Sequence, residues 1–149
     1  HCFGVKIKTV CLNNTAESCE SISRLFKNRK INKLCLLEET IDDDYSKQIL
    51  EWVQSTSVRR IKFEVHNCQM GKPREFLLNI SDLVDRLYID QWDSNDRMGS
   101  LGLFGLFNEN WAQLLAEMFG KRVSYIEIDN VFYYILNSKE DIRQVIEVI

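Results

Sequence analysis

The sequence predicts an α/β fold in which repeated strand–helix units build a mainly parallel five-stranded sheet, with the helices on one face. Two observations support this prediction. The pattern apolar-x-x-apolar-x-apolar occurs five times, in copies that begin at Ile7, Ile31, Val58, Val84 and Val123. Successive copies lie 24, 27, 26 and 39 residues apart, which leaves room for one strand and one helix in each period.

This period and this order of elements are typical of a leucine-rich-repeat-like βα array. Sequential strands that are separated by a helix need a crossover connection, and such connections join parallel neighbours with a right-handed geometry. One helix in each unit stacks all the helices on the same side of the sheet. The other face is then open to solvent or to a partner, so the array predicts a binding surface.

The first two units show the pattern most clearly. Apolar and polar residues alternate over 5–12, as in a strand with one buried face, and apolar residues recur every three or four positions over 16–26, as in a helix. The second unit has its strand at 31–37, and residues 40–42 precede a helix whose apolar stripe runs from Ile41 to Val53. Both units therefore predict a strand followed by a helix.

The third and fourth units are less regular. The third has a strand at 58–65, a loop-like stretch at 66–73 and a segment at 75–83 that fits either a short helix or an extended chain. The fourth has a strand at 84–89, followed by an insertion over 91–107 that explains the longest step between copies.

The last part of the chain returns to the regular pattern. A helix is predicted over 109–119, where Gly120 provides the stop. The fifth strand at 123–128 precedes an apolar segment at 131–136 and a closing helix at 138–148. Because no linker interrupts the units, we expect residues 1–149 to form a single repeat-like recognition domain.

Candidate binding residues follow from the direction of the side chains. The first, fourth and sixth positions of each copy face the core, so the third, fifth and seventh face outward. Outward positions on neighbouring strands form a basic column and an acidic column, namely Lys33, Arg60 and Arg86, and Glu64, Asp90 and Asp129. Either a partner of complementary charge binds here, or Arg60 pairs with Glu64 or Asp90 and the face is merely soluble. The predicted partner-binding residues are Lys33, Arg60, Lys62, Glu64, Arg86, Tyr88, Asp90 and Tyr125.

Other clusters are weaker candidates for chemistry. The acidic residues within 38–44 could hold a hard cation, but they lack the spacing of an EF-hand, and acidic residues also favour the start of a helix. His66 and Cys68 share a strand face, yet zinc needs about four ligands and the sequence has only two histidines. Cys11 and Cys35 fit two free thiols better than a disulfide. We therefore predict no catalytic residue, no metal site and no cofactor.

Composition restricts the class of protein. The 149 residues are 45% hydrophobic and 28% charged, as in an ordinary globular domain, and a net charge of −3 argues against nucleic acid as a partner. No apolar run approaches the roughly 18 residues of a membrane span. Five cysteines without a CxxC motif favour an intracellular protein, cytoplasmic or nuclear. Glycosylation patterns at Asn13 and Asn79 keep open a secreted or luminal adhesion-type repeat, and Cys68 keeps open a small thiol-dependent enzyme.

Two stretches resemble a known family in their repeat texture. Residues 31–36 with the helix to Trp52, and residues 84–92, are similar to the F-box-associated C-terminal domains of nematodes, of the FTH type. The resemblance covers about residues 5–137. It implies a non-enzymatic domain that recognises the protein substrates of a ubiquitin ligase, with an F-box that docks on a Skp1-like adaptor. Since the chain contains no F-box and begins at His1, we expect it to be a C-terminal fragment of a longer protein.

Overall fold

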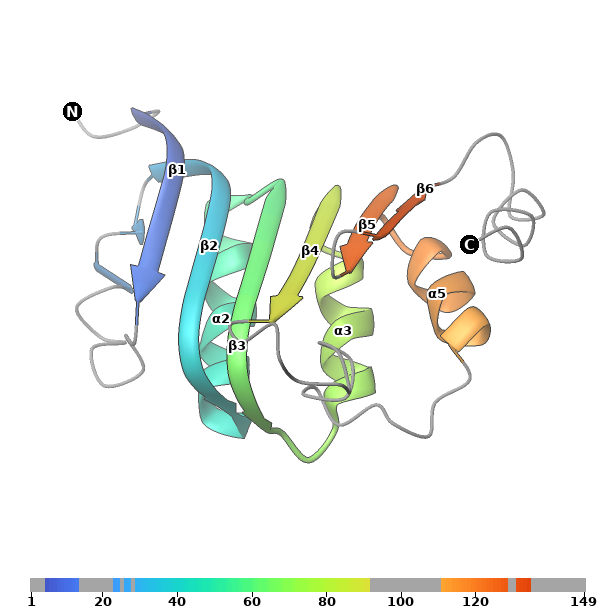
Figure 1. Cartoon of the computed structure of the whole chain (residues 1–149). Helices are drawn as coiled ribbons and strands as arrows, with labels where there is room; N and C mark the ends of the chain where they lie inside the picture. The colour runs from blue at the N-terminus through green and yellow to red at the C-terminus, as the bar shows by residue number, and fades with distance from the viewer. Residues whose placement is uncertain are drawn as a thin grey trace.

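The structure, a computed structural model, describes residues 5–13, 23–24, 26–27, 29–91, 111–128 and 131–134. These residues form a six-stranded sheet in the order β1 to β6, together with three helices (Figure 1). In chain order the elements are β1 (Val5–Asn13), β2 (Arg29–Asp42), α2 (Asp43–Thr56), β3 (Arg60–Gln69), α3 (Pro73–Ser81), β4 (Arg86–Gln91), α5 (Trp111–Phe119), β5 (Tyr125–Ile128) and β6 (Val131–Tyr134).

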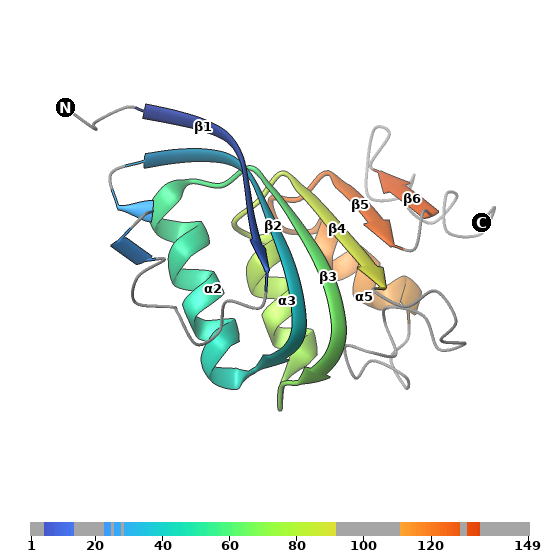
Figure 2. The ribbon, with the colours of Figure 1, turned by 60° about the vertical axis from the view of Figure 1, so that its left-hand side comes forward.

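The predicted parallel sheet is confirmed. Strands β1 to β5 pair in parallel in sequence order, and α2, α3 and α5 lie on one face of the sheet (Figure 2). The sheet also gains a sixth strand that the sequence analysis did not predict, because β6 pairs with β5 in the antiparallel direction. The connection over 129–130 is too short for a crossover, so it joins antiparallel strands.

The core lies between the sheet and the helices. The fourth and sixth positions of the last four copies are at most 4% exposed, namely Leu34, Leu36, Ile61, Phe63, Leu87, Ile89, Ile126 and Ile128. The helices contribute their apolar sides, and Trp52 of α2 is central among them. Its ring forms T-shaped contacts with Phe26 and Tyr45, and its indole N–H donates to Ser23 Oγ at 2.7 Å. The alternation along each strand thus places one face in the core.

A repeated backbone hydrogen bond joins the units at the start of their strands. The second residue of each copy donates its N–H to the carbonyl oxygen of the second residue of the previous copy. The bonds run from Arg59 to Asn32 at 3.2 Å, from Asp85 to Arg59 at 2.8 Å and from Ser124 to Asp85 at 3.0 Å. Four successive copies therefore stack in a constant register, although the last step along the sequence is the longest.

Two strands are longer than the sequence predicted. The strand expected at 31–37 extends to Asp42, and the one expected at 58–65 extends to Gln69, so the first part of the predicted loop at 66–73 is strand. Their extensions pair with each other, from Thr40 with Asn67 to Asp42 with Gln69. Each extension supplies the hydrogen-bonding partner of the other, which local patterns cannot show.

The segment at 75–83, for which the sequence allowed a helix or an extended chain, is mainly helical. Residues 75–83 belong in large part to α3, which begins at Pro73, where the missing N–H of proline has no cost in the first turn. The predicted stop of α5 at Gly120 is confirmed, because the helix ends at Phe119. Helix α2 follows Asp42, as predicted, and runs from Asp43 to Thr56, three residues beyond the last apolar residue of the predicted helix.

Several predictions fall outside the described residues. These are the closing helix at 138–148, Asp129, almost all of the insertion at 91–107 and most of the helix at 16–26. Within the described ranges, no helix has the length and apolar character needed to cross a membrane.

Candidate partner-binding face

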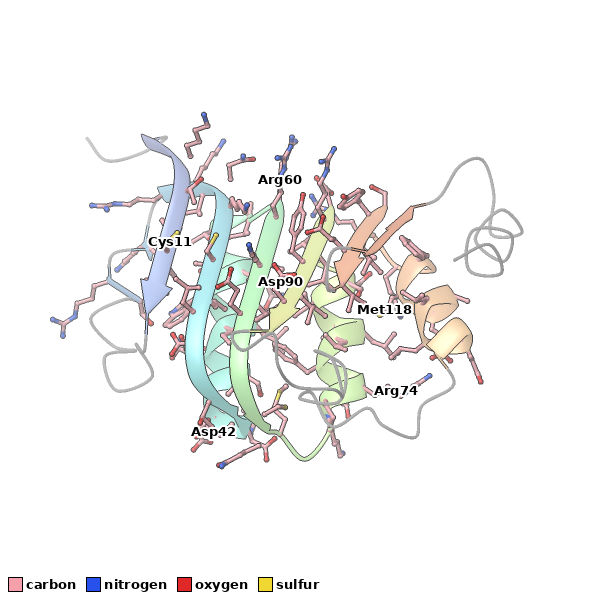
Figure 3. The ribbon with its side chains drawn as sticks, viewed as in Figure 1. Cys11, Asp42, Arg60, Arg74, Asp90 and Met118 are labelled. Atoms are coloured by element: carbon pink, nitrogen blue, oxygen red, sulfur yellow. The ribbon has the colours of Figure 1, made fainter. Side chains whose placement is uncertain are left out.

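The sheet face opposite the helices carries polar and aromatic side chains. We call it the polar face, and its described members on β2 to β5 are Lys33, Cys35, Leu37, Arg60, Lys62, Glu64, Arg86, Tyr88, Asp90, Tyr125 and Glu127. All eight residues predicted to bind a partner lie on it. Figure 3 shows two of them, Arg60 on β3 and Asp90 on β4. The outward direction that the repeat pattern predicted is therefore confirmed for each of them.

The strand register places these residues in rows that cross the sheet. Lys33 is opposite Arg60, Arg60 is opposite Arg86, and Arg86 is opposite Tyr125. The basic column predicted from the sequence is thus a row of adjacent residues. Glu64 and Asp90 are likewise opposite each other, whereas Asp129, the third predicted member of the acidic column, is not among the described residues.

The basic row is joined to two tyrosine rings. Lys33 Nζ lies 5.2 Å from the ring centre of Tyr88, and the guanidinium carbon of Arg86 lies 5.2 Å from that of Tyr125. The two ring centres are 5.7 Å apart and the rings are inclined at 50°. We call Lys33, Arg60, Arg86, Tyr88 and Tyr125 the basic–aromatic cluster. Each cation–π contact at an exposed site contributes about 0.5–1 kcal/mol and orients the cation without neutralising its charge.

Two acidic residues of the polar face, Glu64 and Asp90, are bound to one lysine. Lys62 Nζ lies 3.0 Å from Glu64 Oε1 and 3.2 Å from Asp90 Oδ2, and the three side chains are 20–30% exposed. The hydrogen bond to Glu64 is the main reason that the pKa of the Lys62 ammonium lies above its ordinary value. We call these three residues the Lys62 cluster.

The partner of the carboxylates differs from the one considered in the sequence analysis. Lys62, and not Arg60, pairs with Glu64 and Asp90. Within the described part of the chain, Arg60 forms no ion pair and no side-chain hydrogen bond, although its side chain is partly exposed. The face therefore has two electrostatic regions, a basic one towards the start of the strands and a paired one further along them.

The thiols on the sheet remain free. Cys11, which is labelled in Figure 3, is opposite Cys35 on the neighbouring strand, and both are free thiols. Burial, together with a hydrogen bond to Cys11, raises the pKa of the Cys35 thiol from 9.0 to about 11. Burial also raises the pKa of the half-buried Cys68, which keeps that thiol protonated, whereas a thiol nucleophile needs a lowered pKa. The side chain of His66 lies outside the described residues.

The acidic stretch at 38–44 has a structural role at the start of α2. Asp42 Oδ1 accepts a hydrogen bond from the Tyr45 N–H at 2.8 Å, as an N-cap residue does, and Asp43 and Asp44 follow in the first turn. Glu38 is buried and accepts a 2.6 Å hydrogen bond from the Tyr45 hydroxyl. Among the residues that the structure describes, no group of three His, Cys, Asp or Glu side chains could hold a metal ion.

One feature of the helical side was not predicted. A hollow of about 500 Å³ lies between α2 and α3, lined by Asp43, Ser46, Lys47, Leu50, Met70, Gly71, Lys72, Glu75, Phe76 and Asn79. Asp43 Oδ1 accepts a hydrogen bond from the Gly71 N–H across one end of it, at 2.9 Å. No pattern in the sequence indicates this hollow, because it depends on how far apart the two helices pack.

A scan of protein-family models found no match to the chain, and neither curated proteins nor solved structures gave one.

Proposed function

We propose that this chain is a non-enzymatic protein-recognition domain and that the polar face binds its partner. The observation that carries the proposal is the basic–aromatic cluster, which lies on the side of the sheet opposite the described helices. Arginine and tyrosine are enriched among the residues that dominate interface energies. The helices and the core occupy the other side, so a partner can contact the cluster without disturbing either.

The finer proposal concerns the kind of recognition domain. We propose a short leucine-rich-repeat-like array that serves as the substrate-recognition part of an F-box type ubiquitin ligase receptor. The repeated hydrogen bond between Asn32, Arg59, Asp85 and Ser124 supports a true structural repeat, and the resemblance to nematode F-box-associated domains supports the class. In such a receptor, an F-box outside this sequence would dock on a Skp1-like adaptor, and the protein would be intracellular.

Site-specific photo-crosslinking in cells tests the proposal on the longest natural form of the protein. A photoreactive phenylalanine analogue replaces Tyr88 on the polar face or, as a control, Gln54, which is exposed on α2. We expect defined protein adducts from the Tyr88 position only, and we expect these adducts to accumulate when the proteasome is inhibited. Equal adducts from both positions, or none from Tyr88, would contradict recognition through the polar face. Failure to co-purify a Skp1-like adaptor would contradict the ligase proposal alone.

The alternatives have less support. In the glycosylation pattern at Asn79 the asparagine is exposed, but Ser81 is fully buried and its hydroxyl donates to the carbonyl oxygen of Leu77 at 2.7 Å. The raised pKa of Cys68 does not favour thiol catalysis. A mass shift after glycosidase treatment of protein from its native source would instead support the secreted, adhesion-type alternative.

A further inference from the structure

We propose that the partner presents an acidic segment, with at least two carboxylates, to the basic–aromatic cluster. This inference rests on the proposed function and names the chemistry of the partner. The acidic segment lies across the strands, along the row from Lys33 through Arg60 to Arg86.

The charge of this row is not neutralised within the described part of the chain. Lys33, Arg60 and Arg86 are opposite one another on three neighbouring strands, which lie about 4.8 Å apart. Like charges directly opposite each other destabilise a sheet. The contacts described for Lys33 and Arg86 are with tyrosine rings, which carry no formal charge, and Arg60 forms no ion pair among the described residues. A segment with carboxylates would relieve this repulsion.

Among the described residues, no carboxylate of the same face forms an ion pair with this row. Glu64 and Asp90 are both bound to Lys62, at 3.0 and 3.2 Å. The Lys62 cluster carries one more negative than positive charge, so it repels a second acidic group. The two regions therefore fix the position of an acidic segment, which is attracted at the start of the strands and disfavoured further along them.

The residue types also favour carboxylates with an apolar neighbour. The planar guanidinium groups of Arg60 and Arg86 match the geometry of a carboxylate and can bind it through two parallel hydrogen bonds. Tyr88 and Tyr125 provide flat surface beside these groups, and stacking already holds the cation of Arg86 in place. Less side-chain freedom is then lost on binding, which raises affinity.

The distance between the cations of the row determines how far apart the acidic residues of the partner should lie. Lys33 and Arg86 are separated by two strand spacings, or about 10 Å. An extended peptide places alternate side chains about 6.8 Å apart on one side. Two acidic residues at positions i and i+2 therefore fall within reach of the three cations, whereas adjacent ones point to opposite sides.

Selection from a library of random 12-residue peptides on phage tests the inference with a defined probe. We expect selection on the wild-type protein to enrich acidic residues at positions i and i+2. A synthetic peptide of this kind is then measured by fluorescence anisotropy. The Kd should weaken at least tenfold in Arg60→Glu/Arg86→Glu, while Lys47→Glu/Lys72→Glu, which changes the net charge equally at exposed positions of the helical side, should leave it unchanged.

The outcomes separate this inference from the proposed function. Acidic peptides that lose affinity only with the arginine variant, and lysine-substituted peptides that regain affinity for it, would support the inference. Selected peptides without acidic residues that still depend on Tyr88 would overturn the acidic segment and leave recognition by the polar face intact. The inference of an acidic segment would also be overturned if no peptide were enriched, or if a single-stranded oligonucleotide bound more tightly than the selected peptides. Crosslinking from Tyr88 would then test the proposed function separately.

Discussion

Replacing Lys62 with methionine tests whether the Lys62 cluster stabilises the sheet. Methionine matches the unbranched apolar stem of lysine and lacks the ammonium group. The substitution leaves Glu64 and Asp90 opposite each other on β3 and β4 without the cation that now lies 3.0 and 3.2 Å from them. We therefore expect Lys62→Met to lower the free energy of unfolding.

The size of the effect follows from the exposure of the groups. A solvent-exposed ion pair contributes about 0.2–1 kcal/mol. The side chains of Lys62, Glu64 and Asp90 are only 29%, 30% and 20% exposed, so each pair belongs at the upper end of that range. Two pairs lost, with like charges left opposite each other, give a loss of about 1–2 kcal/mol. For a domain of this length, that loss lowers Tm by about 3–6 °C.

Urea denaturation at pH 7 and low salt measures the loss, with Lys47→Met at an exposed position of α2 as the control. The triple variant Lys62→Met/Glu64→Gln/Asp90→Asn should recover most of the stability, because it removes the like charges as well. High salt should reduce the difference between wild type and Lys62→Met. Equal unfolding midpoints for these two proteins, or a triple variant no more stable than the single one, would refute the reasoning.

The pH dependence provides a second check on Lys62. Its pKa is higher in the folded chain than its ordinary value of 10.5, so the folded chain binds the proton more tightly than the unfolded chain does. The stabilisation is complete below the pKa of the unfolded lysine and is lost as pH rises through the folded pKa. The difference in stability between wild type and Lys62→Met should therefore be constant from neutral pH until the pH approaches 10.5. It should shrink as the pH rises further.

Three further predictions concern other parts of the fold. Phe63→Ala should lower the free energy of unfolding by about 3–5 kcal/mol in urea denaturation, because this fully buried ring packs against Phe76. Ser57→Gly should raise it by about 0.5–1 kcal/mol, because Ser57 ends α2 with a φ of 54°, which glycine adopts without strain. At pH 8, alkylation of Cys35 should be about tenfold slower in the folded chain than in urea, because its pKa of about 11 lowers the thiolate fraction about 100-fold and higher nucleophilicity restores part of the rate. Peptide mass spectrometry measures that rate, and equal rates in both states would contradict the raised pKa.

The sequence predicted the sheet because the period of the apolar residues is a local property. Alternation such as that of Leu34 and Leu36 identifies the buried face of a strand, and a helix between strands forces parallel pairing. The prediction from the sequence failed where this alternation is interrupted. Glu38 lies in β2 just beyond the predicted strand, and it can be buried there because the hydroxyl of Tyr45 on the next helix donates a hydrogen bond to it at 2.6 Å. That contact exists only once α2 has folded back against the sheet.

The residues of the polar face were also predictable, but their partners were not. Register follows from the repeat, so the rows of Lys33, Arg60 and Arg86 could be derived from the sequence. The choice of cation for Glu64 depends on side-chain conformation, since Arg60 and Lys62 lie on the same face of one strand. Flexible side chains with similar reach cannot be ranked by sequence spacing alone.

The alternation of charged and buried residues along the parallel strands is unusual. Sheets of parallel strands are normally covered on both faces, and such strands are almost continuously apolar. Here charged or polar residues alternate with buried ones on three parallel strands, as in Lys33 and Leu34, Arg60 and Ile61, or Arg86 and Leu87. A layer of helices over the polar face would bury the charges of Lys33, Arg60 and Arg86 at high cost. The sequence therefore selects against an apolar cover, and the proposed partner would satisfy the same positions with its own carboxylates.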